Sequence, residues 1–195
     1  MLRQLIVFSA ILLSTAATGQ VKDNIVPAKA AETKTDYHQP GSPMPALHVA
    51  TFDTLKRSKR FLRQHEGDSS VPLTKVLHAK DFDNKGNLIV MMFNPTCGHC
   101  EDQTDRFEKN TALFVNTRLL LLANLTMKAY LPDFIKNHKI NNYPMFTIGM
   151  DNGDFIKETF LYQSLPQINI YDKNRKLVRM YNGEVPMDSL KQFID

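Results

Sequence analysis

The sequence predicts an α/β protein with a central mixed β-sheet flanked by helices. Two continuous apolar runs, Asn87–Phe93 and Arg118–Asn124, are typical of strands that are buried on both faces. Each run precedes a segment with a helical pattern, Cys97 to about Phe114 and Met127–His138. Buried strands that alternate with helices favour parallel crossover connections within one sheet.

The C-terminal third predicts an antiparallel hairpin and a closing helix. Gln167–Tyr171 and Lys176–Tyr181 alternate apolar and polar residues on either side of the four-residue turn Asp172–Arg175. Pro186–Ile194 carries apolar residues at three-residue spacing, which indicates a short helix.

Shorter elements are expected in the rest of the chain. Ala46–Phe52 is predicted as an edge strand, followed by a helix or irregular segment through His65 and a turn at Glu66–Ser70. Tyr143–Gly149 is a further short strand candidate, and a short helix is expected near Phe155–Phe160.

The N-terminal region predicts export. Residues 1–19 have the pattern of a secretory signal peptide, with Arg3 before the apolar run Leu5–Leu13. That run is about half of the ~20 residues that a membrane span needs, so stable membrane insertion of the mature chain is not expected. Residues 20–44 are polar and proline-rich, which predicts a flexible linker before a single domain at 45–195.

The charge pattern favours no nucleic-acid partner. The formal net charge is +4 and the pI is about 9.0, which is mildly basic for 195 residues. The densest basic cluster, Lys56–Arg60, is interpreted as the solvated face of a short amphipathic helix, since no nucleic-acid-binding motif accompanies it.

The two cysteines of the chain form a Cys97-Gly98-His99-Cys100 motif directly after the first apolar run. A structural disulfide that closes so short a loop removes little entropy from the unfolded chain, so a stabilising cross-link is a poor explanation for the two cysteines. A structural zinc site needs four ligands, and no nearby histidine spacing supplies the other two, so no metal is expected. The motif therefore predicts a redox pair that alternates between dithiol and disulfide.

Three stretches resemble one family: Val90–Cys100 with the motif, Gln163–Asp172 with Leu165-Pro166, and Lys173–Gly183 with its terminal glycine. Over about 45–195 the chain resembles thioredoxin-fold proteins, in particular the exported thiol–disulfide oxidoreductases of the TlpA/ResA-like, redoxin-type family. The resemblance implies protein thiols and disulfides as substrates, an upstream redox partner, and location in a bacterial periplasm. It implies no cofactor beyond the Cys97–Cys100 disulfide.

The motif predicts a role for each of its side chains. Cys97, at a helix N-terminus, would be the nucleophile, and Cys100 would resolve the mixed disulfide. A partly protonated His99 would favour the thiolate and make the disulfide a better oxidant, and the alternative is a solvent-facing histidine without a tuning role. The direction of the reaction and the oligomeric state stay open.

The resemblance also implies a substrate-binding role for Leu165 and Pro166. In the family, the residue before a cis-proline aligns the substrate backbone beside the sulfurs, so we expect a cis Leu165–Pro166 bond, with an ordinary trans proline as the alternative. Two departures from the family pattern stand out. Thr96 replaces the usual tryptophan, and Leu88–Phe93 contains no carboxylate for proton relay.

Other interpretations concern nearby acids, isolated histidines and rival functions. Glu101 and Asp102 fit dipole-compensating surface acids at the start of a helix. The histidines without a motif are read as surface or satisfied core residues: His48, His65, His78 and His138. The rivals on the same fold are a peroxiredoxin-like peroxidase, whose usual Thr–Cys spacing is absent, and a Sco-like copper chaperone, whose cysteines are spaced by three residues.

Overall fold

The computed structural model describes residues 35–47, 49–51, 75–77, 79–82 and 85–194. They belong to one compact unit, Thr35–Asp195. Several predicted features lie outside the described residues: the signal peptide, the basic cluster 56–60, the turn at 66–70, and His48, His65 and His78. Within the described part of the chain, no helix combines the length and apolar character needed to cross a bilayer.

A seven-stranded mixed sheet forms the centre of this unit, with the strand order β2-β1-β5-β4-β3-β6-β7. Its strands are β1 (Val49–Thr51), β2 (Lys75–Leu77), β3 (Leu88–Phe93), β4 (Arg118–Asn124), β5 (Phe146–Asp151), β6 (Gln167–Tyr171) and β7 (Leu177–Asn182). β3, β4 and β5 pair in parallel, whereas the remaining pairings are antiparallel. The mixed sheet, with its parallel centre and C-terminal hairpin, confirms the architecture predicted from the sequence.

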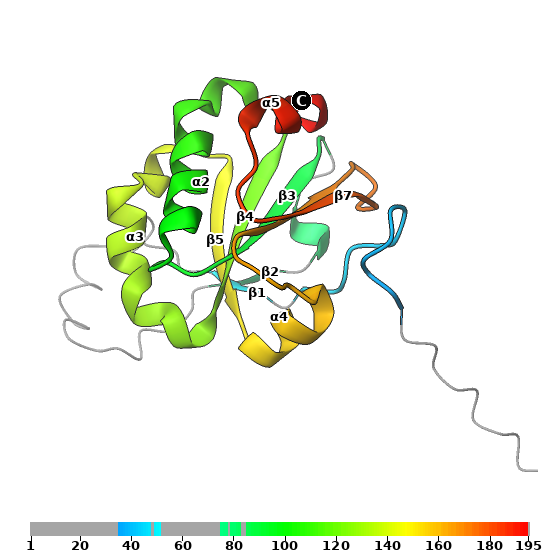
Figure 1. Cartoon of the computed structure of the whole chain (residues 1–195), viewed down its shortest axis with the longest axis horizontal. Coiled ribbons are helices and arrows are strands. Elements are labelled where there is room, and N and C mark those ends of the chain that lie inside the picture. The colour runs from blue at the N-terminus through cyan, green and yellow to red at the C-terminus, as the bar shows by residue number, and fades with distance from the viewer. Residues whose placement is uncertain (1–34, 48, 52–74, 78, 83–84, 195) are drawn as a thin grey trace, which may run out of the picture. The chain divides into compact units, whose positions relative to one another are not determined.

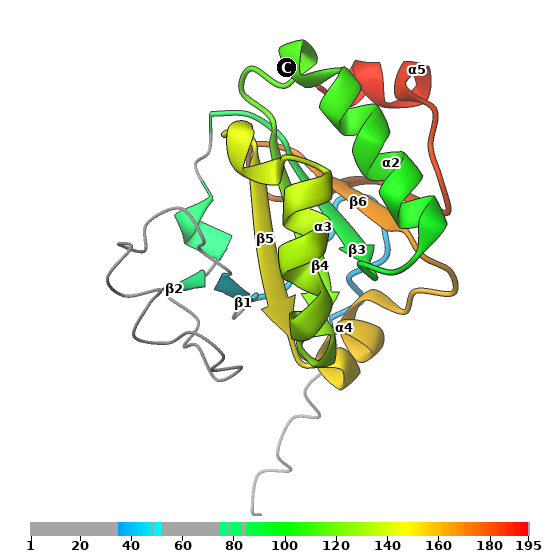
Figure 2. The same ribbon diagram turned by 90° about the vertical axis from the view of Figure 1, so that its left-hand side faces the viewer.

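The apolar run of β3 is buried on both faces because each face of the sheet carries its own core. Ile89, Met91 and Phe93 pack into the core under α2 (Gly98–Lys109) and α3 (Leu131–Asn137), which Figure 2 shows side by side on one face. Leu88, Val90 and Met92 alternate with them and face the second core, which includes residues of α4 (Gly153–Phe160). Each buried side chain of this size contributes about 1.5–3 kcal/mol, so both faces hold β3 in register.

Both long helices are shorter than predicted. α2 ends at Lys109, and a 3₁₀ turn, Thr111–Leu113, replaces the rest of the expected helix. Asn110 marks the break: its side chain donates to the carbonyl of Arg106 at 2.8 Å, so a side chain replaces a backbone donor.

The second long helix is also divided. A 3₁₀ segment, Leu125–Tyr130, precedes α3, and Pro132 lies in the first turn of α3. Because proline lacks an N–H and clashes with the preceding turn, one α-helix through the whole of Met127–His138 is disfavoured.

Two strand assignments needed correction. β1 is not an edge strand, because it pairs with β5 on one side and with β2 on the other. β5 begins at Phe146 rather than at Tyr143. A turn occupies the earlier residues, in which the Phe146 N–H donates to the carbonyl of Tyr143 at 3.2 Å.

The C-terminal elements follow the prediction closely (Figure 1). β6 and β7 form the hairpin, and α5 (Met187–Leu190) with a 3₁₀ turn at Lys191–Phe193 closes the chain. Arg175 in the turn has a φ of 58°, and its guanidinium donates to backbone carbonyls of the turn and of the segment before β3.

The last residues of the expected linker pack against this hairpin. The Gly41 N–H donates to the carbonyl of Leu177 at 2.7 Å, and the Met44 N–H donates to that of Arg175 at 2.8 Å. Met44 and Leu47 are buried in the second core. The packed unit therefore extends N-terminally beyond residue 45.

Candidate functional site

The first cysteine lies where β3 passes into α2. Cys97 is the N-cap residue of α2, with extended backbone angles, and its carbonyl accepts from the N–H groups of Cys100 at 2.9 Å and Glu101 at 3.0 Å. Its side chain is half-buried. The N-terminus of a helix leaves backbone N–H groups without intrahelical partners, and α2 presents the sulfur of its N-cap residue at this end.

Asn94 shapes the loop between the strand and the first cysteine. Its side-chain oxygen accepts from both the N–H and the hydroxyl of Thr96 at 2.9 Å, and its carbonyl accepts from the Cys97 N–H at 3.1 Å. Its backbone N–H donates to the sulfur of Cys100. One residue therefore holds both ends of the motif in place.

The second cysteine is in a different environment from the first. Cys100 is fully buried, at 0% exposure, in the core between the sheet and α2. Burial raises the pKa of the Cys100 thiol strongly, and the Cys97 side chain raises it further, although the Asn94 N–H opposes this. Both residues are free thiols. The pair is therefore asymmetric: a visiting molecule can reach the first sulfur, whereas the second is hidden behind it.

The predicted substrate-binding residues lie between the two cores. The Leu165–Pro166 peptide bond is cis. Leu165 is half-buried and packs against both cores, the first of which it shares with Cys97. The carbonyl of Pro166 accepts from the Gly183 N–H at 2.7 Å, and Gly183 has a φ of 85°, in the region that favours glycine.

A cavity of about 130 Å³ adjoins Leu165. Leu165 and Asn94 are among the residues that line it, and its wall is a mixture of polar and apolar surface. The other lining residues are Met92, Phe93, Leu122, Asn124, Met127, Gly153, Ile156 and Tyr162.

His99 has a partner that the sequence did not indicate. Its side chain is 74% exposed, and its Nδ1 lies 2.5 Å from Oε1 of Glu184, which follows β7. The other carboxylate oxygen of Glu184 accepts from Arg106 at 2.5 Å. Glu184 lies 85 residues from His99 along the chain and belongs to no motif, so no sequence signal could have identified it.

Comparison with solved structures identifies the fold. The sequence matches no protein-family model and no curated protein sequence. The structure is similar to StoA from Bacillus subtilis, with 12% identity, a TM-score of 0.52, and coverage of 79% of this chain and 98% of that chain. It is also similar to the thioredoxin domain of a thiol-disulfide oxidoreductase from Bacteroides vulgatus, with 14% identity, a TM-score of 0.54, and coverage of 80% and 99% respectively. The chain has the thioredoxin fold.

On this thioredoxin fold, the described structure groups four of the five predicted site residues around one core. Cys97, Cys100 and Leu165 pack into or against the core under α2, and Pro166 follows Leu165 directly. His99 points instead to Glu184. No carboxylate lies in β3 beneath Cys100, because every β3 side chain is apolar.

A second cluster of ionisable groups lies between α2 and α3. Asp105, Glu108 and His138 have ligand atoms within 4.8 Å of one another. Each is already paired: His138 Nδ1 lies 2.8 Å from Asp105, while Glu108 accepts from Lys139 at 3.3 Å and from Tyr143 at 3.1 Å. His138 is buried and paired with Asp105, as expected for a core histidine whose hydrogen-bonding needs are met.

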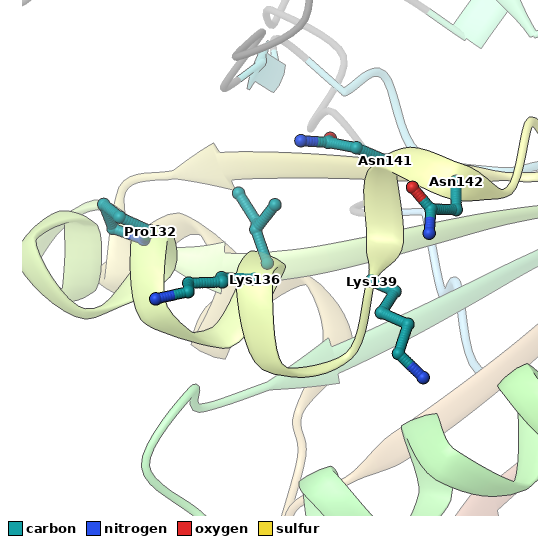
Figure 3. Close-up of a pocket in the computed structure, with 6 residues that line it drawn as sticks. Pro132, Lys136, Lys139, Asn141 and Asn142 are labelled. Carbon is teal, nitrogen blue, oxygen red and sulfur yellow. The ribbon is translucent and has the colours of Figure 1, made fainter.

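A larger cavity of about 430 Å³ opens beside α3. It is lined by Pro132, Ile135, Lys136, Lys139, Asn141 and Asn142 (Figure 3). The ammonium groups of its two lysines point apart, so they do not converge on one anion. Its lining residues include none of the motif.

Proposed function

We propose that this chain is an exported thiol–disulfide oxidoreductase of the TlpA/ResA-like type. It exchanges disulfides with protein substrates through Cys97 and Cys100. The observation that carries the proposal is the asymmetry of the pair: an accessible sulfur lies at the N-cap position of α2, and a fully buried sulfur lies behind it. Similarity to the thioredoxin domain of a thiol-disulfide oxidoreductase supports it.

The asymmetry sets the order of the two exchange steps. The Cys97 thiolate attacks one sulfur of a substrate disulfide, forming a mixed disulfide and releasing the other substrate sulfur as a thiolate that takes up a proton. The Cys100 thiol then loses its proton and attacks the Cys97 sulfur. This step releases the second substrate thiolate and leaves a Cys97–Cys100 disulfide, so two electrons pass to the substrate. An upstream thiol partner restores the dithiol, and the reverse sequence oxidises a substrate.

The raised pKa of Cys100 makes the second step the demanding one. A buried neutral thiol is a poor nucleophile until it is deprotonated, so attack on the mixed disulfide needs a proton acceptor. β3 offers no carboxylate for this purpose. Water or the departing substrate thiolate takes that role in the proposed mechanism.

The substrate is an extended polypeptide segment. In this proposal the backbone of Leu165 pairs with that segment as an added strand, a role that the family resemblance implies. The adjoining cavity of about 130 Å³ has both polar and apolar lining and would receive one side chain of the substrate segment. The signal-like residues 1–19 support export, and detection of the cleaved chain in a periplasmic fraction would test it.

The test is reduction of insulin by dithiothreitol with catalytic amounts of protein. Cys97→Ser should abolish the acceleration, whereas Cys100→Ser should accumulate a mixed disulfide with the substrate. Asp188→Asn, which changes an exposed carboxylate on α5, serves as the control and should behave as wild type. Unchanged insulin reduction in Cys97→Ser would contradict the proposal.

Alkylation provides an independent test of the same asymmetry. Iodoacetamide should modify Cys97 in the folded, reduced protein and leave Cys100 unmodified until urea is added, because Cys100 has no exposed surface. Modification of Cys100 first, read by peptide mass spectrometry, would exclude the assigned order of attack.

A further inference from the structure

Glu184 lies in a segment that joins separate parts of the site. On one side of it, the Gly183 N–H donates to the carbonyl of Pro166 at 2.7 Å. On the other side, the Val185 N–H donates at 2.7 Å to the side-chain oxygen of Gln103, which is buried within α2. The backbone on both sides of Glu184 is therefore held, and its carboxylate projects from a fixed position.

Both oxygens of that carboxylate are used by side chains of α2. Oε1 lies 2.5 Å from His99 Nδ1, and Oε2 accepts from Arg106 Nη2 at 2.5 Å. The carboxylate side chain is 23% exposed, so its bonds are partly shielded from water. This pairing fixes the orientation of a His99 ring that would otherwise move freely in solvent.

We propose that Glu184 is a positioning residue that sets the reduction potential of the Cys97–Cys100 pair through His99. This inference rests on the proposed function. A carboxylate bonded to one ring nitrogen favours the imidazolium form of a histidine. An imidazolium beside the N-terminus of α2 favours the reduced pair with its thiolate, which makes the disulfide more oxidising.

Other charged groups surround Glu184, and their direct effect on the cysteines has to be separated from the effect that passes through His99. Arg106 neutralises Glu184 at its second oxygen, so the pair has little net charge of its own to act on the cysteines. Two further acids belong to the same turn of α2: Glu101 contributes to the raised pKa of Cys100, and Asp102 lies within 4.8 Å of His99 and Glu184. Removing the Glu184 charge would also leave the Arg106 guanidinium without this partner, and that direct effect does not depend on the His99 ring. The same change must therefore be measured with and without the imidazole.

A double-mutant cycle tests this route. The equilibrium between each protein and glutathione is measured for wild type, Glu184→Gln, His99→Ala and the double variant, by trapping free thiols with an alkylating agent. In the wild-type background, Glu184→Gln should shift the equilibrium about two- to fivefold toward the protein disulfide, a size suited to an ion pair with one exposed partner. In the His99→Ala background, this shift should vanish or reverse.

Asp102→Asn is the matched control, because it removes a carboxylate that lies near the same ring. Among the described residues, the Asp102 carboxylate makes no ion pair or hydrogen bond. Its shift should be smaller than that of Glu184→Gln. Equal shifts for the two variants, no shift for Glu184→Gln, or the same shift with and without His99 would each overturn the inference.

A readout that does not depend on redox chemistry completes the test. Ring ¹⁵N NMR of His99 should show the proton on Nδ1 in wild type and lose that preference in Glu184→Ala. Ring signals that are the same in both proteins would contradict the proposed contact between His99 and Glu184. If wild type forms no Cys97–Cys100 disulfide with glutathione, the proposed function fails. If the disulfide forms in every variant with equal ease, only the role of Glu184 fails.

Discussion

Replacing Tyr171 with phenylalanine should reduce the loss of folding stability at high pH. Tyr171 is fully buried in β6, opposite Leu88 of β3, and burial raises the pKa of its phenol from 10.0 to about 12. Below pH 10 the phenol is neutral in both the folded and the unfolded chain. Between pH 10 and 12 the unfolded chain loses the proton while the folded chain keeps it, so the free energy of unfolding falls as pH rises.

The size of this effect follows from the two pKa values. At about pH 11 the unfolded phenol is mostly ionised and the folded one mostly neutral, which corresponds to a loss of about 1 kcal/mol in the free energy of unfolding. At about pH 8 the substitution should itself cost less than about 1 kcal/mol, because the hydrogen bond that the phenol accepts from the Asn169 amide is long, at 3.4 Å.

Urea unfolding of wild type and Tyr171→Phe at both pH values measures this difference. Wild type should lose about 1 kcal/mol more than Tyr171→Phe between about pH 8 and pH 11. Cys100 is present in both proteins, so its ionisation cancels in the comparison. Tyr130→Phe, at a residue that is 53% exposed, controls for the general loss of a phenol. Equal losses in wild type and Tyr171→Phe would refute the reasoning.

Two further predictions concern packing and a buried hydrogen bond. Gly86→Ala should lower the free energy of unfolding by about 1–3 kcal/mol, because its Cβ would lie 2.7 Å from the backbone of Asn116. Gly98→Ala is its control and should not destabilise, since a Cβ there meets nothing within 4 Å. Gln103→Ala should cost about 1–3 kcal/mol by leaving the Val185 N–H unpaired, and an unchanged urea midpoint would contradict that role.

Local patterns were sufficient for most of the fold. The continuous run at Leu88–Phe93 predicted a strand buried on both faces, and the alternation around Asp172–Arg175 predicted a hairpin, because side-chain periodicity depends only on neighbouring residues. Helix ends were predicted less well. At Asn110 a side-chain hydrogen bond ends α2. Pro132 lacks a backbone N–H, so α3 begins beside it instead of continuing from the preceding 3₁₀ segment.

The position of β1 could not be predicted in the same way. Its three residues show no sign of a partner on either side, and its place depends on β2 and β5, which lie far along the chain. Register between distant strands is set by which faces they bury together, and a short strand carries little of that information.

By itself, the sequence determined that two cysteines lie one helical turn apart after a buried strand, since that placement follows from contiguous residues and their spacing. Only the tertiary structure decided that Cys100 is sealed while Cys97 is reachable, and that His99 meets Glu184. Burial and long-range pairing depend on how the hairpin and α2 pack across the sheet. The energy of those contacts comes from surfaces that are brought together only when the chain folds.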